Sequence, residues 1–222
     1  VVRADEVATG CGSDDVLDST IRAFAEPGDR LAFPEPTFGM LPLFARMNGV
    51  SAVPVPMPDP YELDVAALLA TRARVTYVCA PNNPTGISYA AERLEQLIEH
   101  AAGVVIIDEA YAEFCGSTWI SRAPQHARLV VARTMSKAFG LAGLRIGYAT
   151  AHPSLILGIE KARGPYMISG AAERAALAAL RDTDWMRANV RHAEMNRAKL
   201  IEALREAGMR PLDSAANFVF VP

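Results

Sequence analysis

The chain has 222 residues, of which 51% are hydrophobic, and a formal net charge of −3. It is too long and too apolar to be a disordered tail or a disulfide-stabilised miniprotein, and its weak acidity argues against a nucleic-acid-binding protein, whose surface is usually basic. The 22 basic residues comprise 19 Arg and only three Lys, namely Lys137, Lys161 and Lys199. Any lysine chemistry must use one of these three.

The sequence has no signature of a membrane, secreted or metal-binding protein. No run of about 18 or more apolar residues is present, so no transmembrane helix is predicted. The segment Val1–Glu6 carries acidic residues and lacks the apolar centre of a signal peptide. Three scattered cysteines, Cys11, Cys79 and Cys115, form no CxxC pair, which favours a reduced, cytoplasmic protein. The histidines are also scattered, and we predict no metal site.

Short apolar runs alternate with amphipathic stretches along the chain. The predicted strands span 30–33, 50–55, 75–80, 104–107, 129–133 and 145–149. The predicted helices span 14–25, 37–47, 64–71, 89–101 and 153–162. The run 104–107 is apolar on both faces, as in a parallel strand that is buried under helices on each side. The alternation predicts an α/β fold with a mostly parallel sheet sandwiched by helices.

The character of the sequence changes after Gly164-Pro165. Residues 169–181 are rich in alanine and predict a helix, and 184–207 predict a long amphipathic helix whose basic residues form a solvated face. A second αβ unit therefore begins here. We predict a large domain over 1–163 and the incomplete start of a smaller α+β C-terminal domain over 164–222.

Polar residues follow three consecutive predicted strands, at the ends where open α/β sheets bind ligands. The three sets are Asn83 within the sequence PNNPTG, Asp108 with Tyr111, and Thr134, Ser136 and Lys137 with Arg145 beyond them. Each set alone is a weak signal, because an Asp after a strand is often a helix cap and PNNPTG can be a simple turn. Their order and position together make a specific signal.

Pyridoxal phosphate needs the side chains that these strand ends supply. Its aldehyde needs a lysine, and its ring nitrogen needs a carboxylate so that the ring can take up electrons. Its phenolic oxygen needs hydrogen-bond donors, and its phosphate needs hydroxyls, an arginine and a helix N-terminus. Lys161 and Lys199 lie within predicted amphipathic helices, so Lys137 is the lysine that stands at a strand end.

The sequence resembles the fold-type I pyridoxal-phosphate aminotransferases, and most of all the histidinol-phosphate aminotransferase group. The resemblance is carried by Gly10–Asp14, Pro36–Met40, PNNPTG at 81–86, Asp108–Phe114, Thr134–Gly147 and Ala216–Phe218. It implies the large-domain fold of that class, pyridoxal 5'-phosphate as cofactor and a homodimer.

The resemblance also implies a role for each matching residue near the reacting atoms. Lys137 would bond to the cofactor aldehyde and, once displaced by substrate, would move the proton from the substrate α-carbon. Asp108 would pair with the ring nitrogen. Tyr111 and Asn83 would hydrogen-bond the phenolate oxygen. Lys137, Asp108 and Tyr111 are therefore the predicted catalytic residues.

The remaining matches would bind the phosphate and the ring. Thr134, Ser136 and Arg145 would hold the phosphate, and the turn Gly12-Ser13-Asp14 would add backbone N–H groups at a helix start. Asp14 would contribute its backbone only, because its carboxylate should point away from a phosphate. Phe38 would stack on the ring. Taken alone, Ser13 is also explained as a helix N-cap and Phe38 as a core aromatic.

The implied reaction transfers an amino group between histidinol phosphate and 2-oxoglutarate or glutamate, a step of histidine biosynthesis. Three alternatives stay open: an aromatic amino-acid aminotransferase, a pyridoxal-phosphate decarboxylase of a phosphorylated amino acid, and a cofactor-binding fragment without full activity. Members of the family are longer, and the arginine that grips the substrate carboxylate lies in a segment absent here. The segment 217–222 is typical of a strand cut short, so we expect a longer natural protein.

Overall fold

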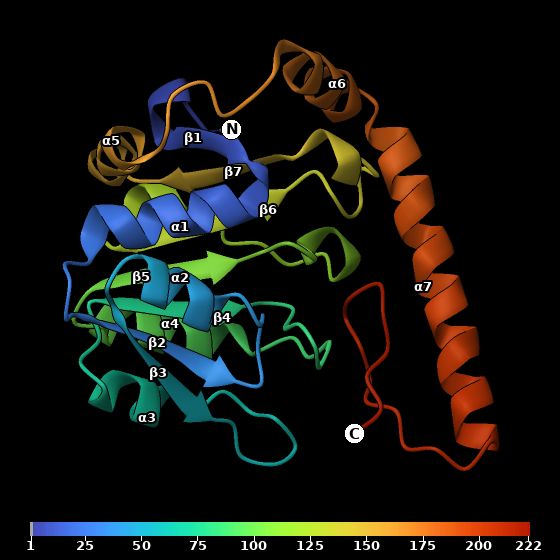
Figure 1. The fold of residues 1–222 in the computed structure, drawn as a ribbon. Helices are drawn as coiled ribbons and strands as arrows, with labels where there is room; N and C mark the ends of the chain where they lie inside the picture. The colour runs from blue at the N-terminus through green and yellow to red at the C-terminus, as the bar shows by residue number, and fades with distance from the viewer. Residues whose placement is uncertain (1) are drawn as a thin grey trace.

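A seven-stranded sheet with helices on both faces forms the body of the molecule in the computed structural model, which describes residues 2–222 (Figure 1). The strands are β1 (Val7–Cys11), β2 (Arg30–Glu35), β3 (Ser51–Pro56), β4 (Val75–Cys79), β5 (Val104–Asp108), β6 (Leu129–Thr134) and β7 (Ile146–Ala151). The helices are α1 (Gly12–Phe24), α2 (Leu41–Met47), α3 (Val65–Ala70), α4 (Ala91–His100), α5 (Pro153–Ala162), α6 (Gly170–Arg181) and α7 (Thr183–Glu206). Short 3₁₀ turns span Ala4–Glu6, Ala112–Phe114, Ala123–Gln125 and Ala142–Leu144.

The strand order is β1-β7-β6-β5-β4-β2-β3. The pairs from β3 through β6 are parallel, whereas β7 runs antiparallel to both of its neighbours, β6 and β1. The predicted α/β fold with a mostly parallel sheet is therefore confirmed, and the six predicted strands are present. Sequence reasoning missed β1, a five-residue strand that contains a glycine and pairs only with the antiparallel β7.

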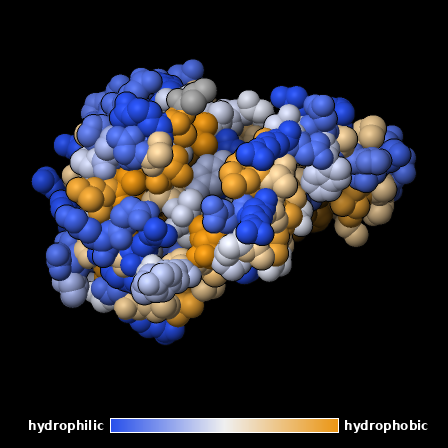
Figure 2. All heavy atoms as spheres, turned by 90° about the horizontal axis from the view of Figure 1, so that it is seen from above, coloured by the Kyte–Doolittle hydropathy of each residue, from blue (hydrophilic) through white to orange (hydrophobic). Residues whose placement is uncertain are grey.

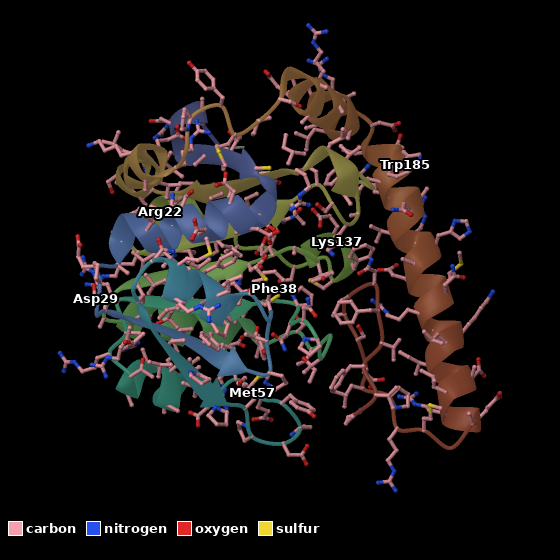
Figure 3. All side chains as sticks on the ribbon, in the orientation of Figure 1. Arg22, Asp29, Phe38, Met57, Lys137 and Trp185 are labelled. Atoms are coloured by element: carbon pink, nitrogen blue, oxygen red, sulfur yellow. The ribbon has the colours of Figure 1, made fainter. Side chains whose placement is uncertain are left out.

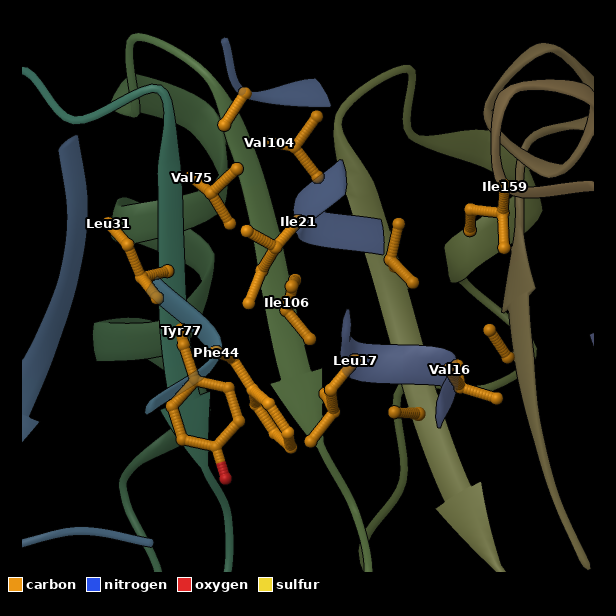
Figure 4. Packing of buried hydrophobic residues seen from close by; sticks show 14 of the residues in the cluster. Val16, Leu17, Ile21, Leu31, Phe44, Val75, Tyr77, Val104, Ile106 and Ile159 are labelled. Carbon is orange, nitrogen blue, oxygen red and sulfur yellow. The ribbon is translucent and has the colours of Figure 1, made fainter. Parts of the chain in front are cut away.

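Alternate residues of the central strands pack into two separate cores. Val75 and Tyr77 of β4 face α1, α2 and α5, and Figure 4 shows this layer from close by. Val78 of β4 packs on the other face, with residues of α3 and α4. Strand β5 is buried along its whole length, as its doubly apolar sequence predicts. Because both faces are covered, ligands can reach the central strands only at their ends.

Helices α6 and α7 follow the sheet along the chain, close to the segments predicted as helical. Helix α7 is 24 residues long, yet Val190 is its only residue classed as buried. Residues 207–222 run back beside α7 (Figure 1) and form no strand within the described chain. The expectation of a strand at 217–222 is therefore not met. The Phe220 carbonyl instead accepts from the Leu212 N–H at 2.9 Å. Just before that segment, the Ala216 carbonyl accepts from Arg197 of α7 at 2.5 Å.

The surface mixes hydrophilic and hydrophobic side chains, as Figure 2 shows from above. Large apolar side chains are exposed on the two C-terminal helices, among them Leu177 and Leu180 of α6 and Trp185 of α7. Among the described residues, no helix combines the length and the apolar character needed to cross a membrane.

Candidate functional site

A cavity of about 220 Å³ opens where β4, β5 and β6 end. Strand β1 also ends at this edge, and β7 begins there because it runs the opposite way. The topology therefore delivers five chain segments to one place. The lining residues are Ser13, Asp14, Phe38, Cys79, Asn83, Asp108, Ala110, Tyr111, Thr134, Ser136, Lys137, Ala142 and Arg145.

Ten of the eleven residues singled out from the sequence line this cavity, and the eleventh, Gly12, lies directly behind it. Gly12 has φ +80°, and a Cβ atom there would lie 2.5 Å from Nη2 of Arg145. Only glycine allows both the left-handed backbone and this close approach. Figure 3 shows Lys137 and Phe38 at the edge of the sheet that faces α7.

Asp108, the last residue of β5, is a buried carboxylate with 4% of its surface exposed. The Tyr77 hydroxyl donates to its Oδ2 at 2.8 Å, and the Ala110 N–H donates to its Oδ1 at 3.1 Å. Burial raises the pKa of Asp108 to about 6, although these two hydrogen bonds oppose the rise. Each oxygen keeps a further lone pair, so the carboxylate can accept a proton-bearing nitrogen from the cavity.

Lys137 and Tyr111 also line the cavity, and the Lys137 Nζ lies 5.4 Å from the centre of the Tyr111 ring. Tyr111 packs edge-on against Phe218, with ring centres 5.1 Å apart and an interplanar angle of 84°. Burial raises the pKa of Tyr111 to about 12. Its hydroxyl therefore stays protonated near neutral pH and can donate a hydrogen bond to an anionic oxygen.

The other end of the cavity carries hydroxyls, an arginine and the start of α1. Thr134 Oγ1 donates to Ser136 Oγ at 2.9 Å, and the Ser136 N–H donates to Thr134 Oγ1 at 3.2 Å. Arg145 has a left-handed backbone with φ 49°, which directs the chain from the turn 142–144 into β7. Hydroxyl groups, a guanidinium and a helix N-terminus together suit an anion such as phosphate.

Asp14 differs from the sequence-based expectation. Its Oδ2 lies 3.1 Å from Nη2 of Arg145, with both side chains nearly half exposed. The carboxylate thus turns toward the anion-binding end, because the guanidinium attracts it. The N-cap explanation of Ser13 is not supported, since the N-cap of α1 is Cys11. The Cys11 N–H donates to Asp15 Oδ2 at 2.9 Å.

A buried ion network stands behind the cavity, on the residues next to Asp108 and Thr134. Arg133 donates from Nε to Glu109 at 2.8 Å, from Nη1 to Glu113 at 2.5 Å and from Nη2 to Thr118 at 2.8 Å. The Arg133 side chain is 10% exposed and the two carboxylates less than that. The network ties the ends of β5 and β6 together behind the cavity.

Sequence reasoning missed the strand residues that reach the site from within the sheet. Tyr77 and Cys79 share one face of β4 with Asp108 of β5, because Cys79 pairs with Asp108 in the parallel register. Burial raises the pKa of the Cys79 thiol far above its usual value, so it stays neutral. The two-residue period of a strand places Tyr77 and Cys79 on one face of β4, but it does not show which residues of β5 lie beside them.

The sequence profile of the aminotransferase class I and II family matches residues 1–222. The chain therefore belongs to this family, as the sequence motifs predicted. Its fold is also that of solved members: histidinol-phosphate aminotransferase from Sinorhizobium meliloti, in complex with pyridoxal-5'-phosphate, superimposes with a TM-score of 0.92 at 30% identity over 98% of this chain and 61% of that one.

Two curated relatives of similar identity to this chain carry different enzyme names. Histidinol-phosphate aminotransferase of Thermoanaerobacter sp. (strain X514) is 34% identical over 220 residues, covering 97% of this chain and 62% of the relative. Aromatic amino acid aminotransferase of Mycobacteroides abscessus is 36% identical over 226 residues, covering 98% of this chain and 65% of the relative. The chain thus spans somewhat less than two thirds of the length of these relatives.

Proposed function

We propose that this chain is the cofactor-binding part of a pyridoxal-phosphate-dependent aminotransferase that exchanges an amino group between histidinol phosphate and 2-oxoglutarate or glutamate. One observation carries the proposal: a lysine, a buried carboxylate, a phenol and an anion-binding end converge on one cavity of about 220 Å³. The names of several relatives and of the S. meliloti structure support the cofactor and the substrate.

The side chains that line the cavity supply the hydrogen-bond donors and the negative charge that the cofactor needs. Asp108 is a buried anion whose two hydrogen bonds come from neutral donors, so its charge has no buried counter-cation among its bonded partners. A protonated ring nitrogen would supply one. Thr134, Ser136 and Arg145 offer donors to a phosphate, and Asn83 and Tyr111, which line the same cavity, can donate to a phenolate oxygen.

When bound, the cofactor supplies an aldehyde that bonds to amines and a ring that takes up electron density. Lys137 Nζ would bond to that aldehyde and, as a free amine, would take the proton from the amino-bearing carbon of the substrate. Asp108 would keep the proton on the ring nitrogen by its negative charge. Tyr111 Oη would donate to the phenolate oxygen, and Phe38 would cover one face of the ring.

A lysine replacement tests the proposal most directly. In the full-length protein, Lys137→Ala should abolish the visible absorbance change that histidinol phosphate produces in the cofactor-loaded enzyme, and turnover should fall below detection. Lys161→Ala is the matched control, because Lys161 is an exposed lysine of α5 and should keep both signals. Full activity of Lys137→Ala would exclude the assigned reaction chemistry.

An aromatic amino-acid aminotransferase is the second candidate, favoured by the name of the M. abscessus relative. A substrate panel separates the two. Histidinol phosphate should react with a kcat/KM far above that of phenylalanine or tyrosine if the first proposal holds, and the order should reverse if the second does. Mass spectrometry of the products identifies which amine has been converted to a carbonyl.

We also propose that residues 1–163 form the cofactor-binding domain, that 164–222 begin a smaller domain, and that the enzyme is a cytoplasmic homodimer. All residues that line the cavity lie between Ser13 and Arg145, which supports a boundary beyond them. The three cysteines are free thiols, which suits a reducing compartment. Limited proteolysis should cut first near residue 164, and sedimentation of the full-length protein should give twice the chain mass.

A further inference from the structure

We propose that Tyr77 is a positioning residue for Asp108: its hydroxyl fixes the carboxylate at the floor of the cavity and keeps it an anion, ready to pair with a cationic ring nitrogen. The identity of that cation rests on the proposed function. The hydrogen bond and its effect on Asp108 do not, so they can be tested separately.

The geometry joins Tyr77 to Asp108 across two neighbouring strands. Tyr77 is fully buried in β4, and the parallel register places it opposite Ile106 and places Cys79 opposite Asp108. Figure 4 shows its ring in the apolar layer with Phe44 and Leu17, and its hydroxyl pointing along the strands toward their arrowheads. In that direction lies Asp108 Oδ2, at 2.8 Å.

The hydroxyl can act only as the donor in this bond while Asp108 is ionised. Burial and the nearby Asp108 charge raise the pKa of Tyr77 well above its usual value, so it keeps its proton at any working pH. A buried phenol without a partner would cost free energy, and Asp108 is the acceptor it reaches. Tyr77 and the Ala110 N–H thus engage one oxygen each, which fixes the plane of the carboxylate and leaves a lone pair of each oxygen for the cavity.

The same bond opposes the protonation of Asp108. Burial is the largest influence on the pKa of Asp108 and raises it to about 6, and the Tyr77 hydroxyl is the strongest influence that lowers it. Without the hydroxyl, more of Asp108 would be neutral at pH 7, and a neutral acid cannot form an ion pair with a ring cation. The other ionisable groups around Asp108 are Cys79 on β4, Asp14 on α1, Glu109 and Tyr111 after β5, and Lys137 after β6.

Tyr77→Phe tests the inference because it removes one oxygen atom and keeps the ring in the core. In the cofactor-free protein with ¹³C-labelled Asp, NMR should show the Asp108 carboxyl titrating about one pH unit higher than in the wild type, since hydrogen bonds to charged groups are worth about one pKa unit or more. Tyr89→Phe is the matched control. It loses a hydroxyl that contacts Met57 at 3.2 Å and should leave the Asp108 titration unchanged.

The loaded full-length enzyme provides the second readout. Tyr77→Phe should raise the dissociation constant of pyridoxal phosphate about twofold at pH 7 and close to tenfold at pH 5, because a one-unit rise from a pKa of about 6 lowers the ionised fraction of Asp108 by about those factors. The acid limb of its kcat/KM profile should also move about one unit upward, so that activity recovers as the pH rises. A variant that loses only packing would lower activity equally at every pH.

Failure of the proposed function and failure of the inference about Tyr77 give different results. If the wild type fails to bind pyridoxal phosphate, the proposed function is wrong, whereas the Asp108 titration still decides on Tyr77. An unshifted Asp108 titration in folded Tyr77→Phe overturns the inference. If that variant does not fold, the ¹³Cζ signal of Tyr77 in the wild type provides the decision: it should move with the Asp108 titration, and a signal that does not move overturns the inference equally.

Discussion

The two ends of the cavity hold charge in opposite ways. At one end Asp108 is 4% exposed and is fixed by two neutral donors. At the other, Arg145 and Asp14 form an ion pair in which both side chains are nearly half exposed. Water screens the attraction between Arg145 and Asp14, but it does not screen the buried charge of Asp108. The protein must therefore control the charge of Asp108 with its own groups, whereas solvent can adjust the charges near Arg145.

The largest expected difference is in the unfolding free energy, between replacements of Arg133 and of Arg145. Arg133→Met leaves Glu109 and Glu113 as buried carboxylates without a cation, and breaking a buried ion network in this way costs about 3–5 kcal/mol of unfolding free energy. Arg145→Met breaks an exposed pair and should cost only about 0–1 kcal/mol. Urea denaturation of the cofactor-free protein measures both. Equal losses would mean that burial does not separate these two sites.

Asp108 gives the next largest effect, and it depends on pH. Its pKa is raised from 3.8 to about 6 by burial. Below about pH 3 Asp108 is protonated in both the folded and the unfolded state, and no penalty arises. As the pH rises from about 4 to 6 the unfolded state ionises first, so folding stability is lost. Above that window the loss is constant, at roughly 3 kcal/mol for a shift of about two units.

Asp108→Asn isolates this contribution because an amide does not titrate. The unfolding free energy of the cofactor-free variant, minus that of the wild type, should rise by roughly 2–3 kcal/mol between pH 4 and pH 7. Asp184→Asn on α7 serves as the control, since its side chain is 95% exposed and the corresponding difference should stay flat. Parallel curves for Asp108→Asn and the wild type would contradict the buried-anion description. Cofactor affinity should move the opposite way, because the amide cannot pair with a ring cation.

The contrast between the two ends also explains how much the sequence could reveal. Asn83, Asp108, Thr134 and Lys137 could be found because they follow apolar strands, and parallel strands end at one edge of a sheet. Tyr77 could not be found in this way, since its role depends on which residue of the next strand stands beside it. That register is a tertiary property: within β4 a tyrosine looks like any core aromatic.

The predicted elements departed from the structure mainly where local signals compete. The sequence predicts a helix from residue 37, but α2 begins at Leu41, so Phe38 lies in the preceding loop and reaches the cavity. Asp14 was expected to turn away from the anion-binding end, yet it pairs with Arg145 across 131 residues of sequence. Neither the loop path nor this long-range attraction has a periodic signature in the sequence.

Asp14 supplies the smallest predicted effect and the sharpest test of the exposed end. Its carboxylate is bonded to the guanidinium that we propose for phosphate binding, so it should compete with phosphate for Arg145. Asp14→Asn keeps the backbone N–H and removes the negative charge. We expect the affinity for inorganic phosphate to rise about two- to fivefold at low salt, in line with an exposed pair worth up to about 1 kcal/mol. At high salt the affinity should approach that of the wild type, because solvent ions screen the repulsion between Asp14 and phosphate. Isothermal titration at two ionic strengths measures this, and the unfolding free energy should hardly change. A gain that persists at high salt would show that Asp14 acts through the backbone of the helix start, and an unchanged affinity would show that Arg145 does not contact the phosphate.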